Sequence, residues 1–223
     1  MAATLFYLAR NAGALARATE EVRRTFSDVE EIVQGAALNS CAYLRACIDE
    51  AMRMSPSVGG IAPREALRGG LTIDGELVPE GTVLGVPHYT IHHNAAYYPR
   101  PFAYVPERWI AGEQIKNDAA GGYSDNAAVA EGDVARAQAA FCPFSIGPRG
   151  CIGKGLAYAE MMTALARTLW LYDLRRASGG VPDPAEGHPA REWGRHRPDE
   201  YQLIDQFTSL KDGPLVEFRR RDV

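Results

Sequence analysis

The segment Phe144-Ser-Ile-Gly-Pro-Arg-Gly-Cys-Ile-Gly153 carries the residues best suited to chemistry in this sequence. It places Cys151 in a loop rich in glycine and proline, two residues after Arg149. A deprotonated, positioned sulfur serves proteins as a metal ligand or as a nucleophile. A buried cysteine can instead pack as a small apolar side chain. No histidine stands in a recognisable partner motif for a catalytic thiol, so the nucleophile is the less favoured of these uses.

Charged residues form a second set of patterns. Glu50 and Arg53 lie three positions apart on a predicted helix, off its apolar stripe, which is typical of a solvated ion pair worth about 0.2–0.5 kcal/mol. Pro106-Glu-Arg-Trp109 adds a further arginine downstream. Arg64 follows a proline, and His92 lies in a polar stretch. Taken alone, these two residues indicate a surface arginine and a solvated loop histidine.

The elements that must position these residues follow from periodicity and turn signals. Apolar spacing predicts helices over residues 14–26, 40–54 and 155–172. Asp74-Gly75 predicts the turn of a two-stranded hairpin over residues 71–78. Further short strands are predicted at 82–86, 202–204 and 215–218. The fold class is therefore mainly α with small β-sheets, an α+β arrangement.

The sequence indicates that the whole chain, residues 1–223, is a single segment of one fold. Composition shifts divide it into a helical part at 1–58, a β-rich part with the irregular Pro-Glu-Arg-Trp stretch at 59–110, a flexible loop at 111–140, the cysteine loop and following helix at 141–177, and a C-terminal loop with strands at 178–223.

Composition limits the function classes. With 46% hydrophobic residues the chain can build a core, and its net charge of -4 argues against a nucleic-acid partner. The four cysteines form no Cys-x-x-Cys pair, which leaves a zinc or thiol-redox module little support and fits a reducing compartment. The apolar run at 2–9 is too short to cross a bilayer, which needs about 20 apolar residues. No targeting signal is visible.

The cysteine loop fills every fixed position of Phe-x-x-Gly-x-Arg-x-Cys-x-Gly and resembles the haem-binding loop of the cytochrome P450 monooxygenases. The resemblance implies that the thiolate of Cys151 binds the iron of a haem. It implies that Arg149 pairs with a haem carboxylate and that Phe144 packs beside the ring and shields the sulfur. Gly147 and Gly153 would let backbone amides approach the sulfur and tune it.

The resemblance also assigns residues outside the loop. It implies that Glu50, Arg53 and Arg108 form a buried three-residue network that locks the core behind the haem. This implication reverses the interpretation of the first two residues as a solvated pair. It further implies that Arg64 and His92 reach haem propionates.

The activity implied by the resemblance is insertion of one oxygen atom from O2 into a small apolar organic substrate. Electrons would come from an NADPH-dependent reductase that docks on the proximal face near Cys151. The sequence looks most like the eukaryotic microsomal class, with a fungal branch as one option. Members of that class are endoplasmic-reticulum membrane proteins. This chain shows no membrane anchor, so its expected location is cytoplasmic or unknown.

The resemblance covers what looks like only the C-terminal half of the family's chain. The distal N-terminal half is not represented, and neither is the acid–threonine pair that relays protons to oxygen in the family. We therefore assign no catalytic residue in this chain. We expect it to retain haem weakly and to turn over little substrate. The alternative is a truncated, non-catalytic fragment that acts as a haem-free binding remnant.

Overall fold

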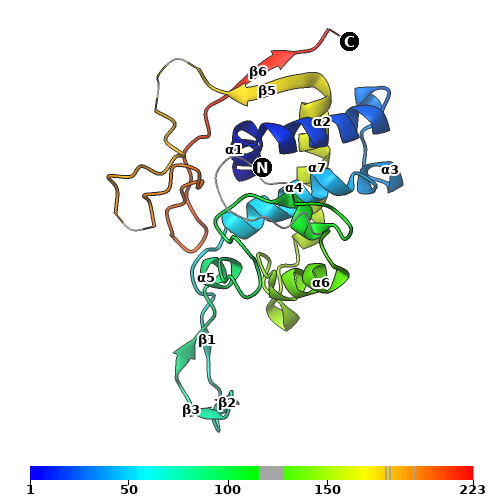
Figure 1. The fold of residues 1–223 in the computed structure, drawn as a ribbon. Helices are drawn as coiled ribbons and strands as arrows, with labels where there is room; N and C mark the ends of the chain where they lie inside the picture. Colours follow the sequence, from blue (N-terminus) through cyan, green and yellow to red (C-terminus); the bar gives the residue numbers. More distant parts are fainter. Residues whose placement is uncertain (116–127, 179, 181, 193, 223) are drawn as a thin grey trace.

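Helices dominate the computed structural model, which describes residues 1–115, 128–178, 180, 182–192 and 194–222. Four helices lie in the first quarter of the chain: α1 (Ala2–Arg10), α2 (Ala12–Thr25), α3 (Ala36–Asn39) and α4 (Ala42–Met54). Helix α7 (Lys154–Leu171) runs beside α2 and α4 (Figure 1). The three helices predicted from apolar spacing are confirmed.

The main core lies where α2, α4 and α7 meet. Apolar side chains that recur at helical spacing on each of these helices point into it, as the buried Val22, Leu44, Ile48, Leu165 and Leu169 show. Helix α4 ends at Met54, and its cap Ser55 directly precedes Pro56, whose ring disfavours further helix. The burial of this face fixes the rotation of α4 and therefore where its charged residues point.

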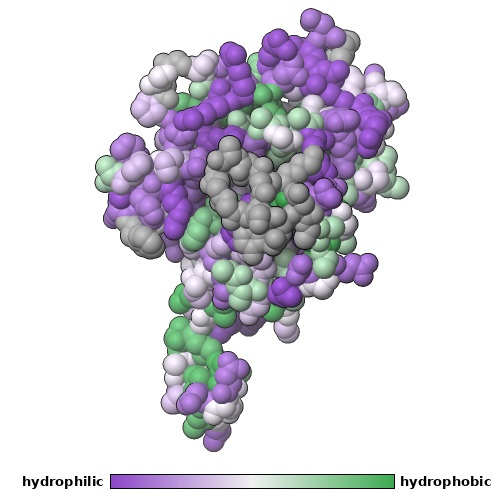
Figure 2. Space-filling model, in the orientation of Figure 1, coloured by the Kyte–Doolittle hydropathy of each residue, from purple (hydrophilic) through white to green (hydrophobic). Residues whose placement is uncertain are grey.

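A narrow arm of short strands, residues 61–87, projects from the helical body (Figure 1). Strand β1 (Arg64–Glu65) pairs with β4 (Val83–Leu84), and β2 (Leu71–Ile73) pairs with β3 (Glu76–Val78), all antiparallel. The predicted hairpin is confirmed. Asp74 and Gly75 both have positive φ, at 48° and 88°, as a two-residue hairpin turn of this kind requires. Figure 2 shows hydrophobic residues gathered on this arm, and the exposed ones include Leu67, Leu77 and Val83.

The C-terminal strands differ in part from expectation. Strand β5 (Tyr172–Arg176) follows α7 directly and pairs with β6 (Val216–Arg220), which confirms the strand expected near 215–218. The strand predicted at 202–204 is wrong. Ile204 forms only an isolated bridge with Leu210, whereas the N–H of Gln202 donates to the carbonyl of Ala185. Successive residues of this stretch pair with different segments, so no ladder forms.

Helix α6 (Glu131–Ala140) corrects the prediction of a loop over 111–140, of which residues 116–127 lie outside the described residues. The segment is rich in alanine, and Glu131 and Asp133 in its first turn suit the helix dipole. It packs on Tyr98, whose hydroxyl donates to the carbonyl of Ala137 over 2.8 Å. The remaining short elements are the 3-10 turn η1 (Val29–Glu31), helix α5 (His88–His92), and the 3-10 turns η2 (Pro106–Trp109) and η3 (Gly147–Arg149).

None of the helices in the described part of the chain is both long enough and apolar enough to span a membrane.

Candidate functional site

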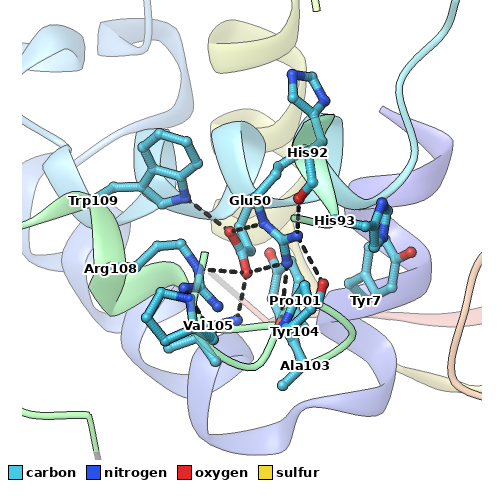
Figure 3. A network of polar contacts seen from close by, with 12 residues as sticks. Tyr7, Glu50, His92, His93, Pro101, Ala103, Tyr104, Val105, Arg108 and Trp109 are labelled. Atoms are coloured by element: carbon cyan, nitrogen blue, oxygen red, sulfur yellow. Dashed lines mark hydrogen bonds and ion pairs between the residues drawn. The ribbon is translucent and has the colours of Figure 1, made fainter. Parts of the chain in front are cut away.

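The carboxylate of Glu50 is the centre of a buried polar network (Figure 3). Its Oε1 accepts from Nη2 of Arg53 at 2.9 Å and from Nε of Arg108 at 3.0 Å. Its Oε2 accepts from Nε of Arg53 at 2.9 Å. Glu50 and Arg53 are both fully buried, and Arg108 is 5% exposed. The interpretation of the first two as a solvated ion pair is therefore wrong, and the structure brings all three residues together.

Arg53 also holds the backbone that surrounds it. Nη1 donates to the carbonyl of His92 at 2.8 Å and to that of Pro101 at 2.7 Å, while Nη2 donates to that of Ala103 at 3.2 Å. The planar guanidinium supplies five donors in a fixed geometry, which suits this task better than a lysine would. Through Arg53, helix α4 is tied to the end of α5 and to the irregular stretch before η2.

The charges of the network are strongly coupled. Burial alone would raise the pKa of Glu50, but Arg108 and Arg53 outweigh it and hold the pKa at about 2. Burial lowers the pKa of Arg108, and the carboxylate of Glu50 opposes that shift. Nη1 of Arg108 donates to the carbonyl of Pro99 at 3.1 Å. With two arginines and one carboxylate ionised, the network stabilises the core rather than supplying a proton donor for chemistry.

Trp109 is a member of this network that the sequence analysis missed. Its indole Nε1 donates to Oε2 of Glu50 at 3.0 Å, and the backbone N–H of Val105 donates to Oε1 at 2.9 Å. The signal was present, because Trp109 closes the same Pro106-Glu-Arg-Trp109 segment that supplies Arg108. An indole carries a donor, and a buried donor needs an acceptor.

The cysteine loop leads into the N-terminus of α7. The thiol of Cys151 is free and exposed, so a buried structural cysteine is the wrong interpretation. Backbone bonds close the loop: the N–H of Cys151 donates to the carbonyl of Phe144 at 2.8 Å, and that of Gly150 donates to the carbonyl of Gly147 at 2.9 Å. Gly147 has a φ of 70°, a conformation that a residue with a side chain adopts only at a cost. Gly153 caps α7 next to the sulfur.

The surroundings of Cys151 suit a flat apolar group with acidic edges. Ile152 is fully exposed, and Ile146 and Leu156 are largely exposed on the same loop and the first turns of α7. Arg149 lies in η3, two residues before the thiol, and provides a cation. A soft sulfur ligand, apolar contacts and an arginine for a carboxylate together match the chemical needs of a haem, so the residues present fit this group on one face.

Phe144 is partly buried and packs against the main core. Its ring lies 5.4 Å from that of Tyr158 on α7, and the hydroxyl of Tyr158 donates to Asp49 at 2.6 Å. This contact fixes one side of the cysteine loop to the helix that follows it.

His92 ends α5 and is fully buried, so the interpretation as a solvated loop histidine is wrong. Its Nε2 accepts from the backbone N–H of Cys142 at 3.0 Å. Within the described part of the chain, its buried Nδ1 has no hydrogen-bond partner. Burial, followed by the nearby charge of Arg53, lowers the pKa of His92 to about 3. The ring is therefore neutral, and Nδ1 is left as an unsatisfied donor that would suit a carboxylate.

Arg64 lies apart from these residues, in β1 of the projecting arm (Figure 1). It is exposed, and its Nη1 donates to the carbonyls of Ala62 at 3.3 Å and Pro63 at 2.8 Å, both in its own segment.

Fold and site together define a mainly helical protein in which an exposed cysteine precedes a long helix and a buried Glu–Arg–Arg network braces the core. The sequence profile of the family described as "Cytochrome P450" matches residues 1–199. The chain belongs to the cytochrome P450 family.

Three similar curated proteins come from fungi. The chain is 42% identical over 220 residues to cytochrome P450 monooxygenase AKT7 of Alternaria alternata, covering 99% of this chain and 40% of that protein. It is 43% identical over 222 residues to a cytochrome P450 monooxygenase of Gibberella zeae, covering 100% and 47%. It is 44% identical over 221 residues to cytochrome P450 monooxygenase lcsN of Purpureocillium lilacinum, covering 99% and 59%. The chain thus spans about half the length of these relatives.

Proposed function

We propose that this chain is the C-terminal part of a haem-thiolate monooxygenase that inserts one oxygen atom from O2 into a small apolar organic substrate. An NADPH-dependent reductase would supply the electrons and dock on the proximal face, near Cys151. The observation that carries the proposal is the exposed, free thiol of Cys151 in its family loop at the start of α7. Residues 1–223 would form one segment of that fold.

The roles proposed for the loop follow from its chemistry. A bound haem would supply the iron that activates oxygen, and the Cys151 thiolate would hold that iron. The positive end of the α7 dipole favours the ionised sulfur. Arg149 would pair with a haem carboxylate, and the φ of Gly147 and the cap at Gly153 would let backbone N–H groups turn toward the sulfur.

Two residues outside the loop are proposed as further haem contacts. His92 has a buried, unsatisfied Nδ1 that would suit a propionate as acceptor. Arg64 is exposed on the arm and donates to carbonyls of its own segment. We propose the first as a propionate partner on this observation, and the second on the family resemblance alone.

The test is a reduced, carbon-monoxide-treated sample of the chain mixed with haem. A red-shifted Soret band of the thiolate type is expected for the wild-type chain and for Cys142→Ser, and its loss is expected for Cys151→Ser. A wild-type sample without this band would rule out haem ligation by the sulfur.

A second function is favoured by the exposed apolar side chains of Ile146, Ile152 and Leu156 beside the thiol. The same surface could bind an apolar partner without haem, as a non-catalytic fragment would. Haem titration separates the two functions: saturable binding at one haem per chain that depends on Cys151 supports the oxygenase, and its absence supports the fragment.

A further inference from the structure

His92 joins the buried network to the segment that carries Cys151. Its backbone carbonyl accepts from Nη1 of Arg53 at 2.8 Å, and its ring Nε2 accepts from the backbone N–H of Cys142 at 3.0 Å. Cys142 stands nine residues before Cys151, at the start of the loop. One residue therefore contacts both the Glu50–Arg53–Arg108 network and the first turn of the cysteine loop.

An aromatic contact makes a second link between the same two parts. The ring of Phe141 lies 5.5 Å from that of His92, at an angle of 30°, and 4.7 Å from that of Trp109. Trp109 in turn donates to Glu50. The residue that precedes Cys142 thus contacts the ring of His92 on α5 and the ring of Trp109 on η2; the network bonds to the backbone carbonyl of His92 and to the indole of Trp109.

Two backbone hydrogen bonds connect the position of Cys142 to that of Cys151 through the loop. The N–H of Ser145 donates to the carbonyl of Cys142 at 2.9 Å, and the N–H of Cys151 donates to the carbonyl of Phe144 at 2.8 Å. Ser145 has a φ of 56°, which marks a tight turn between the two bonds. A shift of Cys142 would therefore move the backbone that sets the position of the Cys151 sulfur.

We propose that His92 is a positioning residue: its Nε2 fixes the start of the cysteine loop to the buried network and so sets where Cys151 stands. The ring must keep a lone pair on Nε2, so the neutral tautomer protonated at Nδ1 is required. The consequence for haem rests on the proposed function, whereas the hydrogen bond itself does not.

The test compares His92→Gln with His92→Leu in the full chain. The glutamine Oε1 can replace Nε2 as an acceptor, and leucine fills space without accepting. In the haem-free protein, hydrogen exchange of the Cys142 amide should be faster by roughly tenfold in His92→Leu, the equivalent of one lost hydrogen bond, and near wild type in His92→Gln. Cys142→Ala keeps the backbone N–H and removes the thiol, whose sulfur lies 3.7 Å from the same Nε2; exchange at position 142 that stays within a few-fold of the wild type is expected and assigns the contact to the backbone N–H.

A second readout uses haem. The fraction of reduced, carbon-monoxide-bound protein with the thiolate-type Soret band should fall in His92→Leu and recover in His92→Gln. The proposal is overturned if both variants show the amide exchange and the Soret band of the wild type. It is also overturned if His92→Leu and His92→Gln lose amide protection and the thiolate band to the same extent. If the wild type itself shows no thiolate band while Cys142 exchange still depends on His92, the haem function fails and the positioning role stands.

A measurement on the wild type covers the case in which His92→Leu does not fold. Nitrogen-15 NMR of the histidines should show His92 neutral, protonated at Nδ1, and coupled through its Nε2 to the Cys142 amide. A ring protonated at Nε2 would overturn the proposal.

Discussion

The indole Nε1 of Trp109 donates to Oε2 of Glu50 over 3.0 Å, although the two residues are 59 positions apart in the chain. Together with two arginines and the N–H of Val105, this bond gives the buried carboxylate donors on both oxygens. A buried charge is tolerated when it is paired and fully hydrogen-bonded, and this one is.

Replacing Trp109 with phenylalanine should remove this donor while keeping an aromatic ring against Phe141. Since the acceptor is an ionised carboxylate, the free energy of unfolding should fall by about 1.5–3 kcal/mol. Denaturant unfolding measures it. Trp170→Phe is the control, because the indole of Trp170 donates to a neutral acceptor, the carbonyl of Phe26, and should lose only about 0.5–1.5 kcal/mol from that bond. A smaller loss at Trp109 than at Trp170 would contradict the charged-acceptor argument.

Removing one arginine of the network should be costly, because it leaves the charge of Glu50 partly unpaired. Arg53→Met and Arg108→Met should each lower the free energy of unfolding by about 3–5 kcal/mol. Arg136→Met provides the comparison, since Arg136 and Asp133 form a pair in which both side chains are about half exposed. That change should cost about 0–1 kcal/mol, and similar costs at buried and exposed sites would argue against the network.

Acid should destabilise the protein through two histidines, the buried His92 and the partly buried His93. Burial lowers the pKa of His92 to about 3 and that of His93 to about 4, from an ordinary value of 6.5. The unfolded chain takes up protons below pH 6.5 while the folded rings stay neutral, so stability is full above pH 6.5 and falls as the pH drops toward 4. Each ring contributes a slope of up to about 1.4 kcal/mol per pH unit.

Unfolding measured between pH 7 and 4 tests this dependence. In the double variant His92→Gln/His93→Gln, the free energy of unfolding should depend less steeply on pH than in the wild type. His188→Gln changes a histidine on the C-terminal loop and should keep most of the wild-type pH dependence. An unchanged slope in the double variant would assign the acid sensitivity to other groups.

Thiol reactivity should separate the exposed Cys151 from the two buried cysteines. Cys151 is exposed, whereas Cys41 and Cys47 are buried, and burial raises the pKa of both buried thiols. A neutral alkylating reagent should label Cys151 first in the native protein and the two buried thiols only on unfolding. Peptide mass spectrometry after timed labelling gives the order. Early modification of Cys47 would contradict the native packing of α4.

Two glycines near the sulfur should respond in opposite directions to alanine. Gly147 has a φ of 70°, so Gly147→Ala should destabilise the fold by about 1–2 kcal/mol. Gly155 lies inside α7 with open space around a new Cβ, so Gly155→Ala should stabilise it by about 0.5–1 kcal/mol. Thermal unfolding of both variants shows whether each substitution lowers or raises the stability. A stable Gly147→Ala protein would show that the loop can adopt another backbone path.

The local elements were predictable because their signals are local. Apolar spacing defines α2, α4 and α7, and Asp74-Gly75 defines a hairpin turn, since only neighbours in sequence decide these features. Alanine-rich α6 was missed because polar and small residues around it resemble a loop, and its helix is completed by packing on Tyr98. The sequence predicts a strand at 202–204, but a strand needs one continuous partner, and here Ile204 pairs with Leu210 while Gln202 bonds to Ala185.

Residue types and their order are enough to give the family loop and to mark Cys151 as its candidate ligand. For Glu50 and Arg53 they favour a solvated pair, and only the resemblance to the family joins these two residues to Arg108 in one network. That Trp109 completes the network and that His92 is buried with its ring on the Cys142 amide depends on the tertiary structure. Those contacts join residues some fifty or more positions apart. Chain folding, rather than any local pattern, brings such distant donors and acceptors within hydrogen-bond distance.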